Sequence, residues 1–69
     1  MEVIKLRGEY IKLGQALKAA GLVESGVEAK IVIQNGEVLV NGRPELLRGK
    51  KLTGGEVISY NGQEIRIEK

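Results

Sequence analysis

The residues of this chain with the most capacity for chemistry are its lysines and arginines, and four of them gather in one short segment. Residues 43–51 read RPELLRGKK and set Arg43, Arg48, Lys50 and Lys51 against Glu45 alone. A local excess of positive charge attracts anions, and phosphate groups in particular. Adjacent lysines in a loop are also common as plain solvated surface, so the segment by itself leaves both interpretations open.

The composition excludes most catalytic and metal-binding chemistry. The chain has no cysteine and no histidine, which removes thiolate nucleophiles, disulfides, thiolate metal sites and the usual proton shuttle near neutral pH. The carboxylates are scattered among lysines as surface charge and form no acidic cluster. Gly54-Gly55 fits a hairpin turn better than a phosphate-binding loop. We therefore expect a protein that is not an enzyme and needs no cofactor and no metal.

The length and charge predict one small domain spanning residues 1–69. The balance of 11 basic against 9 acidic residues gives a formal net charge of +2, which alone is weak evidence for a nucleic-acid partner. The sequence contains no apolar run long enough to span a membrane and no signal-peptide pattern. We expect a cytoplasmic monomer with no membrane partner.

The first helix is predicted at Ile11–Ala20. Its apolar residues recur at helical spacing, which allows one face to be buried, and are Leu13, Ala16, Leu17 and Ala20. Gly21 is suited to end the helix, because a glycine accepts the left-handed conformation that follows a helix C-terminus. Lys12 and Lys18 then point toward solvent.

The second helix is predicted to start after Ser25 and to run for about ten residues. Ser25 and Glu28 form an S-x-x-E capping box, and Asn35-Gly36 supplies a left-handed stop. The β-branched run at residues 31–33 would favour a strand on propensity alone, but the two end signals favour a helix. On that helix Lys30 and Gln34 lie away from the apolar face, and the position of Ile31 is left open.

Strands are predicted on either side of the two helices. Asn41-Gly42, after the run Glu37–Val40, is a strong signal for a tight hairpin. Pro44–Leu52 is expected to be irregular or a short edge strand, because proline cannot donate a ladder hydrogen bond. The other predicted strands are Glu2–Leu6, Glu56–Tyr60 and Gln63–Glu68, the last two following turns at Gly54-Gly55 and Asn61-Gly62. The fold class is α+β, with two N-terminal helices packed on a small, mostly antiparallel sheet.

This layout resembles the S4-type RNA-binding domain, also called the αL motif, over residues 12–60. Lys12-Leu13 and Leu17 match the opening helix of the family. Ser25, Glu28 and Ala29 match its S-x-x-E-A box. The run from Gln34 to Gly42 matches its glycine, valine and VNG pattern, and Leu52 to Ile58 resembles its closing strand with Glu56 in place of aspartate.

Within that family the chain is most similar to small stand-alone bacterial members of the YaaA/YbcJ type. The similarity lies in Ser25-Gly26 at the helix cap and in the basic stretch Arg48–Lys51. The wider family usually has an RNA-contacting arginine where this chain has Gly26, so that side-chain contact is lost. A glycine at a helix N-terminus can instead let a phosphate approach the backbone N–H groups.

The resemblance implies a non-enzymatic protein that binds structured RNA, ribosomal RNA first of all, with a role in ribosome assembly or translation. A positive face on the two helices and the 43–51 loop would make the contact. The expected contact residues are Lys12, Gly26, Lys30, Arg48, Lys50 and Lys51, followed by Lys18, Gln34 and Arg43. Each of the lysines has an alternative interpretation as a solubilising surface residue.

An alternative function is a small protein-interaction module. The edge strands of a small sheet can add a strand from a partner protein, and a net charge of +2 suits that partner as well as RNA.

Overall fold

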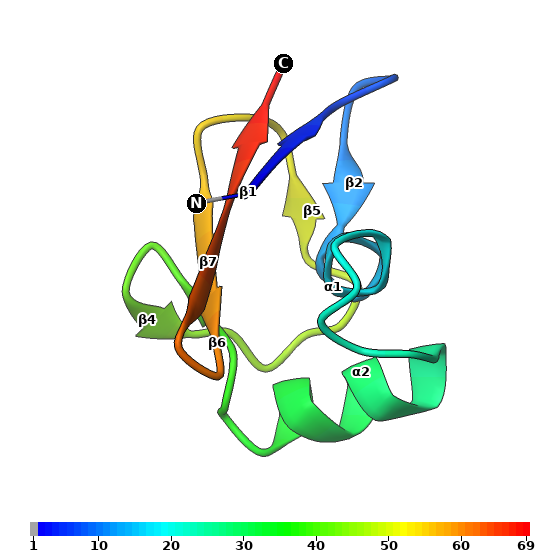
Figure 1. The fold of residues 1–69 in the computed structure, drawn as a ribbon, viewed down its shortest axis with the longest axis vertical. Helices are drawn as coiled ribbons and strands as arrows, with labels where there is room; N and C mark the ends of the chain where they lie inside the picture. The colour runs from blue at the N-terminus through cyan, green and yellow to red at the C-terminus, as the bar shows by residue number, and fades with distance from the viewer. Residues whose placement is uncertain (1) are drawn as a thin grey trace.

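Two helices and seven strands follow one another along residues 2–69, the part of the chain that the computed structural model describes. The helices are α1 (Leu13–Ala19) and α2 (Gly26–Gln34). The strands are β1 (Glu2–Lys5), β2 (Ile11–Lys12), β3 (Leu39–Val40), β4 (Arg43–Pro44), β5 (Lys51–Leu52), β6 (Val57–Tyr60) and β7 (Gln63–Glu68). Figure 1 shows β6 and β7 on the left, α1 on the right with β2 and β5 above it, and α2 below.

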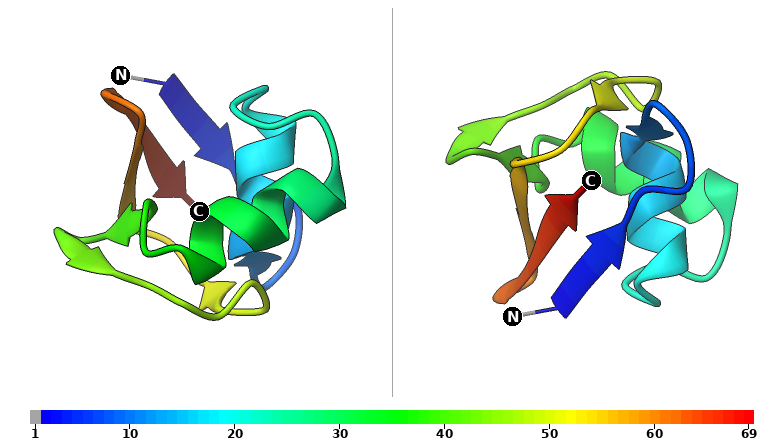
Figure 2. Two further views of the ribbon diagram at one scale, coloured as in Figure 1. Left: turned by 90° about the horizontal axis from the view of Figure 1, so that it is seen from below. Right: turned by 90° about the horizontal axis from the view of Figure 1, so that it is seen from above.

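The strands form two sheets. The larger has the order β1-β7-β6-β3-β4, and the smaller pairs β2 with β5. Every pairing is antiparallel except that of β1 with β7, where Glu2 aligns with Ile65 and Lys5 with Glu68. Figure 2 shows β1 and β7 side by side with the same direction. The predicted α+β class and the mostly antiparallel sheet are therefore confirmed.

The prediction of two N-terminal helices is wrong, because two strands precede α1. The first, β1, is held in the sheet by β7 from the far end of the chain. The second, β2, occupies the first two positions of the predicted helix, since Ile11 pairs with Leu52 and Lys12 with Lys51. The helix consequently starts at Leu13, and Lys12 lies at the end of a strand.

Local hydrogen bonds explain where α2 begins and where both helices end. The N–H of Glu28 donates to Ser25 Oγ at 3.1 Å, while the Glu28 carboxylate accepts from the N–H of Glu24 at 2.8 Å, one residue earlier than a standard capping box. Gly21 and Gly36 have φ of +74° and +75° and close the two helices. A Schellman motif ends each helix. Its 6→1 hydrogen bond runs from the N–H of Leu22 to Leu17 O after α1, and from the N–H of Glu37 to Val32 O after α2.

Two asparagine–glycine pairs form the tight turns that the sequence predicted. Asn41 and Gly42 have φ of 52° and 84°, and Asn61 and Gly62 have φ of 52° and 78°, as type I′ hairpins require. Asn41 has a second role, because its side-chain oxygen accepts from the N–H of Val57 at 3.0 Å and its N–H donates to Val57 O at 2.8 Å. The β3–β4 hairpin is thereby fixed to β6.

The core lies between the helices and the sheet. No polar or charged side chain is buried among residues 2–69, so apolar packing carries the fold. Each fully buried Leu or Ile contributes about 1.5–3 kcal/mol relative to an exposed one. The largest fully buried side chains are Leu13, Leu17, Ile33, Leu52, Ile58, Ile65, Ile67 and Val38.

Candidate nucleic-acid interface

All nine residues expected to contact RNA are exposed, and the fold divides them among three places. Lys12, Lys18, Gly26 and Arg48 line a surface hollow between the starts of α1 and α2. Arg43, Lys50 and Lys51 line a second hollow beside the β3–β4 hairpin. Lys30 and Gln34 lie outside both, on the outer face of α2. The predicted residues do not form one uniform face.

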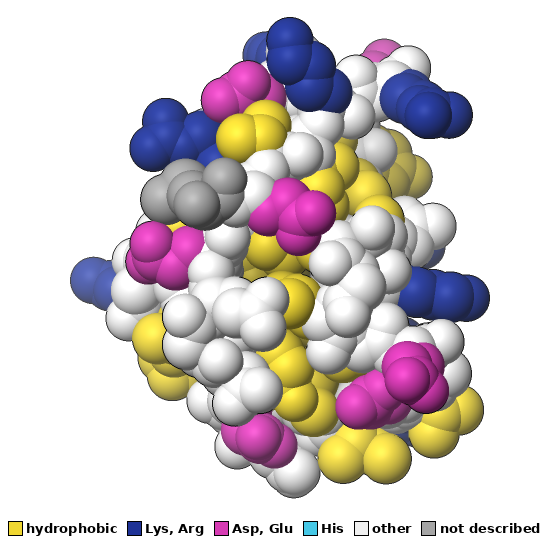
Figure 3. All heavy atoms as spheres, in the orientation of Figure 1, with side chains coloured by type: hydrophobic (Ala, Val, Ile, Leu, Met, Phe, Trp, Pro, Cys, Tyr) yellow, Lys and Arg dark blue, Asp and Glu magenta, His cyan; other side chains and the backbone are white. Residues whose placement is uncertain are grey.

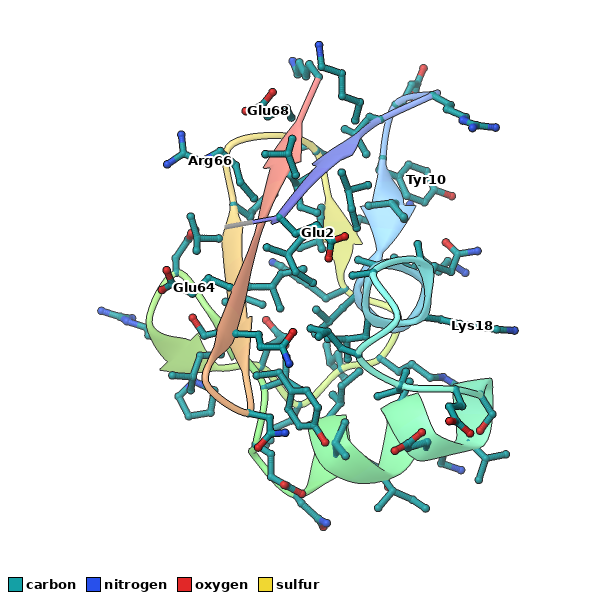
Figure 4. The ribbon with its side chains drawn as sticks, in the orientation of Figure 1. Glu2, Tyr10, Lys18, Glu64, Arg66 and Glu68 are labelled. Carbon is teal, nitrogen blue, oxygen red and sulfur yellow. The ribbon has the colours of Figure 1, made fainter. Side chains whose placement is uncertain are left out.

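The first hollow, called here the α1–α2 hollow, measures about 370 Å³. Its lining brings three cations together, Lys12 from β2, Lys18 from α1 and Arg48 from the 43–51 loop, with Gly26 at the start of α2. No carboxylate appears among the lining residues within the described part of the chain; the others are Gly14, Gln15 and Gly49. Figure 4 shows Lys18 extending from α1 into solvent. The hollow is suited to an anion.

The 43–51 loop is held in place by the first turn of α1. The N–H of Leu13 donates to Lys50 O at 2.8 Å, and the N–H of Gly14 donates to Arg48 O at 3.1 Å. These N–H groups have no partner inside the helix, so the loop carbonyls act as its cap. The Lys12 N–H donates to Gln15 Oε1 at 3.1 Å and completes the arrangement. The cationic residues 48 and 50 thus sit on an ordered backbone.

Gly14 lines the α1–α2 hollow and was not among the residues that the sequence analysis named. A Cβ at this residue would lie 2.7 Å from Cγ of Arg48 and 3.6 Å from the Arg48 carbonyl oxygen. The loop carbonyl is at an ordinary contact distance, so a larger residue at position 14 would displace the Arg48 side chain rather than the loop backbone. The sequence did contain a signal for this contact, namely a glycine inside a predicted helix. A glycine there lowers helix stability by about 1 kcal/mol relative to alanine, which indicates a packing reason for keeping it.

Gly26 differs from Gly14 because a Cβ there would displace no neighbouring side chain. A Cβ at Gly26 would meet nothing within 4 Å, and its φ is not in the left-handed region. The residue is exposed and is the first of α2, after the Ser25 cap.

The second hollow, called here the hairpin hollow, measures about 530 Å³ and contains both signs of charge. Arg43, Lys50 and Lys51 share it with Glu45 and Glu56. The Glu56 carboxylate accepts from the N–H groups of Thr53 and Gly54 at 2.9 and 2.8 Å and so closes the Gly54-Gly55 turn.

The ionisation of Glu56 reflects these contacts. Partial burial acts to raise the pKa of Glu56, but the backbone N–H donors and the charge of Lys50 outweigh it, and the pKa lies below its ordinary value. The carboxylate therefore stays ionised beside Lys50 and offsets part of the positive charge in the hairpin hollow.

Lys51 connects the hairpin hollow to the small sheet. Its Nζ lies 4.8 Å from the centre of the Tyr10 ring, a cation–π contact. Lys51 is also directly opposite Lys12 in the pairing of β2 with β5. Like charges at directly opposed strand positions destabilise a sheet.

The outer face of α2 is mixed rather than basic. Val27 and Ile31 are 68% and 52% exposed there, beside Lys30 and Gln34. Figure 3 shows apolar side chains along this end of the molecule. The structure thus places Ile31, which the sequence left open, in solvent.

Comparison with known proteins agrees with this geometry. The family model described as "S4 domain" matches residues 4–68. The chain belongs to the S4 domain family. The expectation that this S4 domain is not an enzyme agrees with that assignment. No helix of residues 2–69 could cross a membrane, and the same residues hold no group of three metal-ligating side chains.

Two curated relatives have lengths similar to this S4 domain. "Probable ribosome maturation protein RlbA" of Bacillus subtilis is 44% identical over 59 residues, which are 86% of this chain and 83% of that protein. "Putative RNA-binding protein YbcJ" of Escherichia coli is 34% identical over 58 residues, 84% of this chain and 83% of that protein.

A solved structure confirms the αL fold. The solution structure of YbcJ from Escherichia coli, described as having an αL motif involved in RNA binding, matches with a TM-score of 0.76 at 31% identity. The match covers 100% of this chain and 89% of that one. The resemblance to the YbcJ type inferred from the cap and the basic stretch is therefore confirmed.

Proposed function

We propose that this S4 domain binds structured RNA, with the α1–α2 hollow as the main phosphate site. Lys12, Lys18 and Arg48 neutralise phosphates there, and the N-terminal backbone of α2 at Gly26 offers N–H donors. Arg43, Lys50 and Lys51 add a second, weaker contact in the hairpin hollow. Lys30 and Gln34 extend the contact along α2.

One observation carries this proposal. Lys12 and Lys18 meet Arg48, which is distant from them in sequence, in a hollow whose lining, within residues 2–69, includes no acidic residue. Solvated surface lysines would instead be interspersed with carboxylates, as they are in the hairpin hollow. The backbone bonds from α1 to the loop add preorganisation, which lowers the entropy lost on binding.

Folded RNA fits this surface better than single-stranded RNA. The sequence has no Phe and no Trp, and its two tyrosines are Tyr10 and Tyr60. Tyr10 already faces Lys51, and Tyr60 packs partly against the core. A base-stacking platform is therefore missing from the described residues, and recognition rests on phosphate position and RNA shape.

The names of the relatives support a more specific role. A relative named for ribosome maturation is 44% identical, and another is named for RNA binding. We accordingly propose ribosomal RNA as the ligand, ribosome assembly as the process and the cytoplasm as the location. The unit of binding is one copy of residues 1–69.

The test is RNA binding by the purified chain across a series of salt concentrations. Ribosomal RNA fragments are compared with duplex DNA, and Arg48→Ala is compared with Arg66→Ala. Arg66 is exposed on β7, outside both hollows, and its replacement by alanine removes the same charge as Arg48→Ala. Arg48→Ala should lower affinity about tenfold and the salt slope by about one, whereas Arg66→Ala should change little. Equal losses in the two variants would reduce the interaction to non-specific charge attraction and refute the proposed site.

A further inference from the structure

A third hollow, separate from the hairpin hollow, lies where β1 faces β2 and α1. It measures about 510 Å³ and is called here the β1 groove; its lining residues are Ile4, Lys5, Leu6, Arg7, Gly8, Tyr10, Ile11, Gln15 and Ala19. Figure 3 shows apolar side chains reaching the surface in a band between β1 and α1. The RNA proposal makes no use of this groove, although Gln15 borders the α1–α2 hollow as well.

One wall of the groove is an unpaired strand edge. Among the described residues β1 has a single neighbour, β7, because it ends the five-stranded sheet. The N–H of Leu6 donates to Glu68 O at 2.7 Å, so the even-numbered residues of this segment face β7. In a parallel pair alternate residues point their N–H and C=O groups away from the partner. Val3 and Lys5 therefore present backbone donors and acceptors to the open side.

The floor and one end of the groove are apolar. Ile4, Leu6 and Ile11 are partly buried and pack against the core, which leaves part of each side chain in the groove. The Tyr10 ring is 42% exposed and is held by Lys51 at 4.8 Å. An ordered aromatic ring beside a row of aliphatic side chains is typical of the anchor pockets in protein interfaces.

The charge of the groove is one-sided. Lys5 and Arg7 line it, and none of its lining residues is acidic. Glu2 lies at the opposite end of β1, as Figure 4 shows. An acidic ligand is therefore attracted to the Arg7 end and repelled at the Glu2 end, which gives the groove a direction.

We propose that the β1 groove binds an extended acidic segment of a partner protein, which adds to β1 as an extra strand. The free backbone groups of β1 match another polypeptide backbone, and alternating apolar side chains of the segment would lie on the Ile4–Leu6 floor. Four extended residues span about 13 Å, which is the length of β1 at Glu2–Lys5. RNA offers no repeating N–H and C=O groups at this spacing and gains little from an aliphatic floor.

The test uses synthetic peptides and the isotope-labelled full chain. The probe is an acetylated and amidated seven-residue peptide that alternates valine with aspartate. One control replaces each aspartate with lysine, and a second carries N-methyl groups on alternate residues, which blocks one hydrogen-bonding edge. Binding is followed by amide chemical shifts and by hydrogen exchange.

The acidic peptide should shift the amides of β1 and β2 and slow exchange at Val3 and Lys5. The lysine and N-methyl peptides should bind at least tenfold more weakly. Lys5→Glu should weaken the acidic peptide at least fivefold, whereas the matched change Arg66→Glu should have no effect. Arg48→Ala should leave peptide binding intact, which separates this inference from the proposed RNA function.

Several results would overturn the inference. Equal binding of the N-methyl peptide would show that the strand edge is not used. Loss of ribosomal RNA affinity in Lys5→Glu, with no peptide binding by the unmodified chain, would assign the groove to the RNA surface. Self-association of the free chain with the same shifts in β1 would assign the edge to a second copy.

Discussion

The α1–α2 hollow and the hairpin hollow each contain three predicted cations, yet they differ in their anions. Lys12, Lys18 and Arg48 meet no carboxylate among the lining residues of the first, whereas Glu45 and Glu56 line the second. Both carboxylates also accept backbone hydrogen bonds from their own turns, Glu45 from Leu47 and Glu56 from Thr53 and Gly54. A count of basic residues therefore overstates the attraction of the hairpin hollow for phosphate. The arrangement suits the first hollow to binding and the second to stability.

The largest expected effect on RNA affinity comes from replacing the three basic residues of each hollow with alanine, one hollow at a time. The triple variant Lys12→Ala/Lys18→Ala/Arg48→Ala should lose about a hundredfold or more in affinity for structured RNA, since each charge-assisted contact contributes about 1.5 kcal/mol or more. The matched triple Arg43→Ala/Lys50→Ala/Lys51→Ala removes the same charge and should lose about tenfold or less. Filter or anisotropy binding at one salt concentration measures both. A larger loss from the second triple would reverse the comparison.

The next effect concerns Glu56. Removing its charge should make the hairpin hollow more positive and so more like the α1–α2 hollow. Because the pKa of Glu56 is lowered in the folded state, the folded protein binds fewer protons than the unfolded one at mildly acidic pH. The resulting stability is complete above the ordinary pKa of 4.5 and is lost as the pH falls through the folded value. Glu56→Gln should therefore cost about 1 kcal/mol near neutral pH and flatten the acid side of the stability profile.

The same variant should bind RNA a few-fold more tightly, since an anion beside Lys50 has been neutralised. Urea unfolding between pH 3 and pH 7 and RNA binding at pH 7 test the two parts separately. An unchanged acid profile would mean that the hydrogen bonds to Thr53 and Gly54 do not depend on the charge.

A smaller effect is expected where the loop meets α1. Gly14→Ala gains about 1 kcal/mol of helix propensity but forces Arg48 to move, because its Cγ lies 2.7 Å from the new Cβ. The two contributions should nearly cancel in unfolding free energy, while RNA affinity falls about threefold to tenfold as Arg48 leaves its place. Gly8→Ala, which meets nothing within 4 Å and lies outside both hollows, is the control. Loss of stability without loss of binding would show that the position of Arg48 is unimportant.

The smallest effect is a gain. Gly26→Arg restores the arginine of the wider S4 family at a position with open space around it and adds a fourth cation to the α1–α2 hollow. Affinity should rise a few-fold and the salt slope by about one. If affinity falls instead, the Gly26 backbone is the contact, because the longer side chain keeps the phosphate away.

Features that depend on neighbouring residues were predictable from the sequence. The Ser25 cap, the stops at Gly21 and Gly36 and both asparagine–glycine hairpins require only a few adjacent residues, and each is present in the structure. The β-branched residues of α2 did not turn it into a strand, because the cap and the Schellman stop agree with the burial of Ala29, Val32 and Ile33.

Features that depend on distant pairing were not predictable. Ile11 and Lys12 continue the helical pattern of α1, and only the strand at Lys51-Leu52 makes them β2. The carbonyls of Arg48 and Lys50 that cap α1 also come from a segment distant from α1 in the sequence. For the site, sequence identified exposed basic residues but not their division between two hollows, because that division follows from the loop docking on α1.

The parallel pairing of β1 with β7 has a consequence for the synthesis of the protein. Glu2 meets Ile65, so the first strand finds its only described neighbour at the opposite end of the chain. Closing a loop of this length has an entropic cost that later contacts must repay, and such pairings form slowly. On the ribosome β1 must wait until residues 63–68 have left the exit tunnel. The five-stranded sheet is therefore completed only after residues 63–68 have emerged.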